Sequence, residues 1–137
     1  MYYVDTNVFI YPIIYDETER KALNAKNILI KIAEGSLECI TASLTWDELT
    51  WIIRKTLGVK IAIEEGRRFL KFPNLKIVSV DEKIIREAQK IVEKYKVKPR
   101  DAIHASCAVK NKVKEIISDD PDLNKIKEIR RIELDRI

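Results

Sequence analysis

The side chains best suited to chemistry in this 137-residue chain are four acids far apart in the sequence: Asp5, Glu48, Asp101 and Asp120. A single histidine, His104, excludes both a two-histidine acid–base pair and a zinc site rich in histidine. The three glycines are too far apart for a phosphate-binding loop, in which bare backbone wraps around the anion. Any chemistry must therefore rest on carboxylates, in a chain of which 35% of the residues are charged.

These acids fall where predicted strands end or where the following helices begin. Asp5 and Asp120 each follow an expected strand, and Glu48 and Asp101 each lie in the first turn of an expected helix. In a parallel sheet these positions share the carboxyl edge, where ligands bind. We therefore expect the four carboxylates to converge at that edge.

Short apolar runs alternate with longer helical patterns along the chain, without a linker, repeat or low-complexity segment. This alternation is typical of an α/β fold in which helices cover both faces of a central, mostly parallel sheet. The length suits one domain, residues 1–137. The expected strands are residues 2–4, 38–42, 75–80, 115–118 and 130–134, and the expected helices are residues 16–34, 43 or 45 to 57, 60–72, 82–95 and 99–112.

Converged carboxylates repel one another, and removing them from water together is costly. Such a cluster normally keeps its charge by binding a hard cation. Because the cluster offers oxygen ligands without histidine or cysteine, the expected ion is Mg²⁺ or Mn²⁺.

Each acid also has a purely local interpretation. Glu48 completes a capping-box pattern that starts at Thr45, in which the acid bonds back to the cap. The segment Asp5–Asn7 fits a strand-to-helix turn. Asp101 suits a helix N-terminus, and Ser118–Pro121 fits an Asp-Pro turn. No single one of these interpretations explains why all four acids fall at one predicted edge.

The overall charge does not identify a partner. The chain has 26 Lys and Arg against 22 Asp and Glu, a net charge of +4, and a pI of about 9.0. These values fit nucleic-acid binding. A high content of ion pairs in a protein from a hot environment explains them equally well.

The expected location is the cytoplasm. The two cysteines, Cys39 and Cys107, lie in apolar contexts and predict no disulfide framework. No apolar run approaches the roughly 18 residues of a membrane span, and the first residues lack the pattern of a signal peptide. We expect no contact with a membrane.

Four segments together resemble the successive motifs of PIN domains: Asp5-Thr6-Asn7, Glu48 within its helix, Pro99-Arg100-Asp101-Ala102-Ile103-His104-Ala105, and Ser118-Asp119-Asp120-Pro121-Asp122-Leu123. The resemblance covers essentially the whole chain. In length and motif order it is closest to the VapC toxins of type II toxin–antitoxin pairs. It implies a PIN-like fold of three layers.

The resemblance implies an endoribonuclease that uses Mg²⁺ or Mn²⁺ to activate a water molecule against RNA phosphodiester bonds. Asp5 and Asp101 would be the central metal ligands, Asp120 would complete the site or hold a second ion, and Glu48 would bind metal or position water. The supporting polar residues would be Thr6, Asn7 and Ser118.

The position of the fourth acid is ambiguous, because Asp119, Asp120 and Asp122 lie close together in the sequence. The Ser-x-Asp spacing from Ser118 favours Asp120, with Asp122 as a secondary candidate. In the family an aromatic residue often follows the last acid, whereas this chain has Leu123.

A basic run leads directly into Asp101 and is the predicted approach for RNA phosphates: Lys94, Lys96, Lys98 and Arg100. His104, three residues after Asp101, is expected to pack or to bond locally and not to bind metal. Membership of the VapC toxins would further imply a small antitoxin as partner and a homodimer.

Two other functions remain open at this point. The first is a PIN nuclease for RNA processing without a toxin role. The second is a PIN-like module that binds RNA or protein without cutting, although an abandoned site has no reason to retain four mutually repelling acids.

Overall fold

Strand β1 (Tyr2–Val4) lies at the centre of a five-stranded sheet with the order β3-β2-β1-β4-β5. All neighbouring strands are parallel in this computed structural model, which describes residues 1–137. The other strands are β2 (Cys39–Ala42), β3 (Leu75–Val78), β4 (Glu115–Ile117) and β5 (Arg130–Ile132). The helices are α1 (Thr6–Ile14), α2 (Arg20–Ala33), α3 (Leu44–Leu57), α4 (Val59–Leu70), α5 (Glu82–Tyr95) and α6 (Pro99–Lys110), with 3₁₀ turns η1 (Pro121–Lys125) and η2 (Leu134–Arg136).

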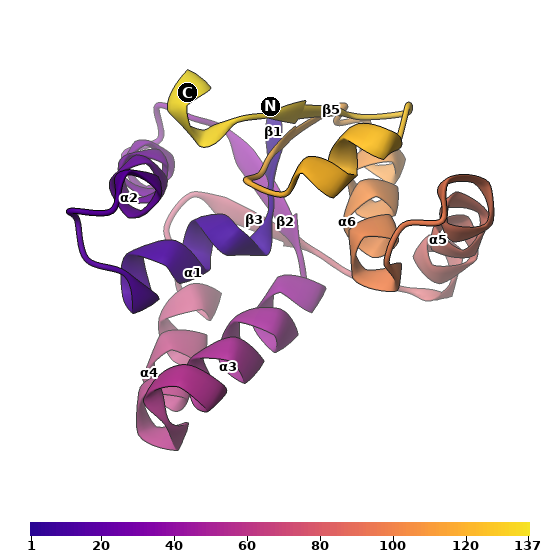
Figure 1. The fold of residues 1–137 in the computed structure, drawn as a ribbon. Coiled ribbons are helices and arrows are strands. Elements are labelled where there is room, and N and C mark those ends of the chain that lie inside the picture. The colour runs from indigo at the N-terminus through magenta and orange to yellow at the C-terminus, as the bar shows by residue number, and fades with distance from the viewer.

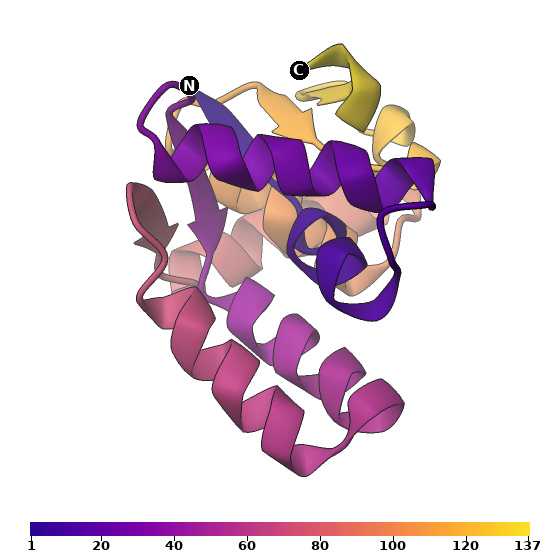
Figure 2. The ribbon, with the colours of Figure 1, turned by 90° about the vertical axis from the view of Figure 1, so that its left-hand side faces the viewer.

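Helices cover both faces of the sheet because side chains on its central strands alternate between two apolar cores. Tyr3 and Ile116 belong to the core on the side of α5 and α6. Val4 and Ile117 belong to the core formed with α1, α2, α3 and α4. Figure 1 shows α5 and α6 on one side of the sheet, and Figure 2 shows the other helices from the opposite side. The prediction of an α/β fold with three layers is therefore confirmed.

Helix α1, which follows β1 directly, was not predicted from the sequence. Its apolar residues do not form one clean stripe, because α1 is packed between α2 and α3 and three consecutive residues, Val8, Phe9 and Ile10, are all buried. Pro12 also lies inside this helix. The later helices match their predicted positions closely, but α2 begins at Arg20, after the predicted start at residue 16.

Helices α3 and α4 form a hairpin that projects from the body of the molecule (Figures 1 and 2). Gly58 joins them with a φ of 96°, a conformation that favours glycine. The two helices approach closely at Gly66, where an added Cβ would lie 2.8 Å from Cγ2 of Thr50 and 3.1 Å from Nε1 of Trp46. The hairpin therefore depends on a residue without a side chain at this position.

No helix of the structure is long and apolar enough to cross a membrane. Cys39 and Cys107 are both buried and unbridged.

The substitution Gly66→Val should separate α3 from α4, because the branched side chain has no space against Thr50. We expect the free energy of unfolding to fall by about 1–3 kcal/mol. The matched control is Glu64→Val, which places the same residue at an exposed position of α4. Urea unfolding measures both variants, and equal losses would contradict close packing at Gly66.

Candidate active site

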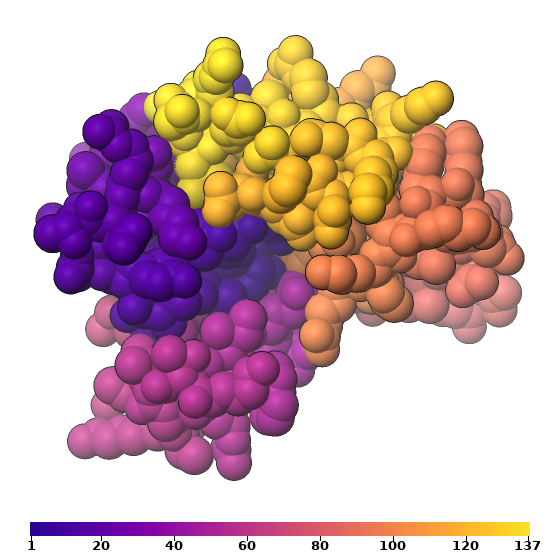
Figure 3. Space-filling view, in the orientation of Figure 1, coloured from indigo at the N-terminus to yellow at the C-terminus, as the bar shows by residue number.

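The four predicted acids lie at the carboxyl edge of the sheet, on segments that meet in space. Asp5 directly follows β1, and Asp120 lies three residues beyond the end of the neighbouring strand β4. Asp101 is in the first turn of α6, and Glu48 is the fifth residue of α3. Figure 3 shows segments from the beginning, middle and end of the chain meeting near the centre of this face.

Asp5 is buried and held by several hydrogen-bond donors. Its Oδ1 accepts a bond from the backbone N–H of Thr6 at 2.8 Å, which caps α1. Its Oδ2 accepts bonds from the hydroxyl of Ser118 at 2.6 Å and from Nδ2 of Asn7 at 3.4 Å. The predicted strand-to-helix turn is therefore present, and the three supporting residues all contact Asp5.

Asp101 is the acid whose charge is least satisfied by the protein. Its Oδ2 is buried and has no hydrogen-bond partner. Burial, followed by the charges of Asp120 and Asp5, raises the pKa of Asp101 to about 6, while His104 and Lys98 oppose this shift. A buried carboxylate oxygen without a hydrogen-bond donor is costly, and a cation is one group that would compensate its charge.

The three acids that lie closest together are Asp101, Asp120 and Asp122, with one carboxylate oxygen of each within 4.8 Å of the others. Asp122 enters this group because the η1 turn folds back and its N–H donates to Oδ1 of Asp120 at 2.9 Å. Asp119 instead accepts a bond from the hydroxyl of Tyr11 at 2.7 Å. The geometry therefore favours Asp120 over Asp119 and gives Asp122 a more central place than the sequence analysis did.

Glu48 does not complete a capping box. The N-cap of α3 is Ser43, and no side-chain bond caps this helix. Thr45 is buried, and its hydroxyl pairs with that of Thr41 at 2.7 Å. Oε1 of Glu48 instead accepts a bond from Oγ1 of Thr6 at 2.8 Å. The local interpretation of Glu48 is therefore wrong, because its carboxylate contacts Thr6 and His104, which both lie next to Asp5.

His104 is 2% exposed and contacts three hydrogen-bonding residues from other elements, which the sequence gave no signal to identify. One ring nitrogen, Nδ1, contacts the hydroxyl of Tyr3, and the other, Nε2, contacts Oε1 of Glu48. Nε2 also lies 3.4 Å from Oγ1 of Thr6 and 3.6 Å from Oδ1 of Asp5. Although burial raises the pKa of Glu48, the bond and charge of His104 outweigh it and hold that pKa below its usual value. Burial also lowers the pKa of His104, but the bond that it donates to Glu48 and the charge of Asp5 raise it overall.

Two of the four predicted RNA-binding residues are occupied by contacts within the protein. Lys94 forms an ion pair with Glu128 at 3.3 Å, and its ammonium also lies over the ring of Tyr95. Lys96 donates a bond to the backbone carbonyl of Glu93 at 2.7 Å. None of these contacts places Lys94 or Lys96 next to the acids.

The other two basic residues lie beside the acids. The charge of Lys98 lowers the pKa of Asp101, and the charge of Arg100 lowers the pKa of Glu48. Nη2 of Arg100 is also 3.9 Å from Oδ2 of Asp47. Positive charge therefore reaches the site from the start of α6.

The residues present fit a hard divalent cation. The closest donors are carboxylate oxygens, one of which is buried and unpaired. Mg²⁺ and Mn²⁺ favour such oxygen ligands, and a bound cation would offset the repulsion among the acids.

In metal-free protein, Asp101 should make stability depend on pH. Its ordinary pKa is 3.8 and its folded pKa is about 6, so the folded state binds more protons between these values. The free energy of unfolding therefore falls as the pH rises from about 4 to about 6. Above pH 6, the free energy of unfolding of Asp101→Asn should exceed that of the wild type by about 1–2 kcal/mol. Near pH 4 this difference should disappear, because the Asp101 carboxyl of the folded state is then protonated.

Urea unfolding in EDTA at several pH values measures this difference. An advantage of Asp101→Asn that is equal at pH 4 and pH 7 would contradict the titration of a buried carboxylate. If Asp101→Asn and the wild type were equally stable at both pH values, burial of the Asp101 charge would carry no cost.

Three solved structures illustrate the similarity of this fold to known proteins. VapBC2 from Rickettsia felis, solved with promoter DNA, is 16% identical and has a TM-score of 0.72 over 96% of this chain and 97% of that chain. VapC20 from Mycobacterium tuberculosis, a toxin that cleaves the sarcin-ricin loop, is 14% identical, with a TM-score of 0.73 over 95% and 99%. FitAcB from Neisseria gonorrhoeae is 16% identical, with a TM-score of 0.71 over 100% of both chains.

At these identities the likeness concerns the fold. No curated protein matches the sequence. The PIN-domain sequence pattern, however, matches residues 2–129, nearly the whole chain. The chain therefore belongs to the PIN-domain family.

Proposed function

We propose that the protein is a divalent-metal-dependent endoribonuclease that acts in the cytoplasm as the toxin of a toxin–antitoxin pair. The observation that carries the nuclease proposal is Oδ2 of Asp101, buried without a hydrogen-bond donor among other carboxylates. The protein supplies no hydrogen bond that compensates this oxygen. A cation on the carboxyl edge would do so.

Asp101, Asp120 and Asp122 would hold Mg²⁺ or Mn²⁺, since their oxygens lie closest together. Asp5 would be a further ligand from the end of β1, and Glu48 would bind metal or orient water. When bound, the cation would lower the pKa of a water molecule and offset the charge that builds on the scissile phosphate. Hydrolysis would leave a 5′-phosphate and a 3′-hydroxyl.

RNA would approach the acids from the start of α6, where Lys98 and Arg100 lie. Both residues act electrostatically on the acids, and neither is buried. They would attract the phosphates on either side of the scissile bond. Lys94 and Lys96, which are engaged within the protein, would contribute less.

Replacing Asp101 with Asn should weaken Mn²⁺ binding and RNA cleavage, each by about 10- to 100-fold, because it removes the charge of the buried ligand. Isothermal titration with Mn²⁺ and gel analysis of a structured RNA measure the two effects. The matched control is Asp119→Asn, in a neighbouring acid that bonds Tyr11. It should change both values by less than about 3-fold.

Cleavage that survives EDTA, or products that end in a 2′,3′-cyclic phosphate, would contradict this mechanism. Absence of Mn²⁺ binding, or equal cleavage by wild type and Asp101→Asn, would favour the non-catalytic binding module.

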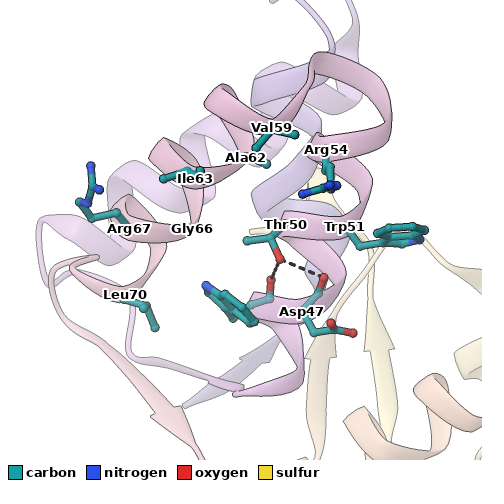
Figure 4. A pocket seen from close by; sticks show the side chains of 11 residues that line it. Asp47, Thr50, Trp51, Arg54, Val59, Ala62, Ile63, Gly66, Arg67 and Leu70 are labelled. Carbon is teal, nitrogen blue, oxygen red and sulfur yellow. Dashed lines mark hydrogen bonds between the residues drawn. The ribbon is translucent and has the colours of Figure 1, made fainter.

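The toxin proposal is supported by an apolar groove between α3 and α4, with a volume of about 430 Å³ (Figure 4). Its lining includes Trp51, Ile63 and Leu70, which are 51%, 56% and 60% exposed. Exposed apolar side chains that gather in one concave place are typical of a surface that another protein covers. We propose that a helix of a small antitoxin covers it, as neighbours of similar fold were solved as VapBC complexes.

The charges around the groove define the helix that would fit. Arg54 and Arg67 both line it. Arg68, nearby, pairs with Glu65 at 3.3 Å, while Arg54 and Arg67 have no such partner. The complementary surface is therefore an apolar helix face flanked by acidic residues.

The substitution Ile63→Asp should weaken binding of the protein encoded by an adjacent small reading frame by about 10-fold or more, since it places a charge in the groove. The control, Ile85→Asp, makes the same change at an apolar residue of α5 that is 46% exposed. Titration calorimetry measures both. Equal affinities would contradict the groove as the docking surface, and absence of any such partner would favour an RNA-processing nuclease.

We also propose that the protein forms a homodimer. Analytical ultracentrifugation of the isolated protein measures its mass in solution, and a monomer at micromolar concentration would overturn this part of the proposal.

A further inference from the structure

The buried ring of His104 links the centre of the sheet to the candidate active site. His104 lies on α6 and is 2% exposed. Its ring nitrogens contact Tyr3 on β1 and Glu48 on α3. Three elements that are distant in the sequence thus meet at one imidazole, which is neither a member of the acidic cluster nor part of the surface.

Tyr3 fixes the orientation of this ring. Its side chain is fully buried, and its hydroxyl accepts a bond from the backbone N–H of Ala42 at 3.1 Å. Ala42 is the last residue of β2, just before α3. The same hydroxyl contacts Nδ1 of His104, and the two rings meet edge to face with centroids 5.6 Å apart. The ring of His104 therefore cannot rotate without breaking a buried hydrogen bond.

The direction of the bond to Glu48 follows from the acceptor. An ionised carboxylate has no hydrogen to give, so Nε2 of His104 must donate. Oγ1 of Thr6 donates to the same atom, Oε1, at 2.8 Å. Both protein donors therefore act on Oε1, and Oε2 has no hydrogen bond from the protein.

We infer that His104 is a positioning residue that fixes the Glu48 carboxylate by donating from Nε2 to Oε1 and thereby leaves Oε2 available to the metal or to water. This inference rests on the proposed nuclease function for its consequence, but the hydrogen bond itself does not. Residues that orient the side chains around a metal commonly change activity or metal affinity by about 10- to 100-fold when replaced.

The hydrogen bond can be observed directly, because the chain contains one histidine. Protein labelled with ¹⁵N-histidine gives an imidazole spectrum from His104 alone. We expect an Nε2–H signal that exchanges slowly with water in the metal-free wild type and that shifts in Glu48→Gln and Tyr3→Phe. An Nε2–H that exchanges as fast as that of free imidazole would overturn the inference, whether or not the protein cleaves RNA.

The functional consequence is tested with three variants. His104→Leu removes the donor and should lower kcat for RNA cleavage about 10- to 100-fold, with KM changed less than about 3-fold. His104→Gln keeps an amide N–H near the position of Nε2 and should recover most of that loss. Ser106→Ala, at a buried residue of the same helix that bonds the carbonyl of Ile84, is the control for packing.

Equal losses in His104→Leu and His104→Gln, tracking their stability to urea, would show a role in packing alone and overturn the inference. Failure of the wild type to cleave RNA would instead overturn the proposed function, while the ¹⁵N spectrum would still report the hydrogen bond. The two failures are therefore distinguishable.

Discussion

The structure depends on the cost of holding several carboxylates together at a sheet edge partly removed from water. Asp101 carries most of this cost, because its Oδ2 is buried and receives no hydrogen bond. Neighbouring acids increase it, and Lys98 and His104 reduce it in part. The repulsion and desolvation of these carboxylates destabilise the folded state, and a bound divalent cation would offset this cost.

The rest of the fold forms the carboxyl edge of the sheet and provides hydrogen bonds that stabilise one of the acids, Asp5. Parallel pairing of β1 with β4 places Asp5 and Ser118 side by side, so the serine hydroxyl can donate to Asp5. The N-terminus of α1 adds a backbone donor to the same carboxylate. Asp5 is thereby satisfied within the protein, whereas Asp101 is not. The two acids that the sequence makes equivalent thus have different environments.

Much of this arrangement could be predicted because it depends on local patterns and on one topological rule. Strand ends and helix starts placed Asp5, Glu48, Asp101 and Asp120 at one edge, and parallel strands share that edge. The fold class followed from the alternation of short apolar runs with helices. Helix α5 begins at Glu82 and ends at Tyr95, which is the predicted range.

Contacts made by the tertiary structure could not be predicted. Helix α1 has no single apolar stripe, because it is buried between two other helices. The proximity of Asp122 to Asp101 depends on the path of a 3₁₀ turn. His104 is packed in the interior, as one of the two expectations had it, but its hydrogen-bond partners Tyr3 and Glu48 lie 101 and 56 residues away in the sequence. A sequence pattern contains no information on such distant pairs.

Burial destabilises the charge of the Asp101 carboxylate, and a bound cation would stabilise it. Carbon-detected NMR of the side-chain carboxyl, with and without Mg²⁺, measures this directly. We expect the Asp101 carboxyl to titrate near pH 6 in metal-free protein and with a midpoint at lower pH when Mg²⁺ is added. A midpoint near the ordinary value of 3.8, unchanged by Mg²⁺, would contradict it.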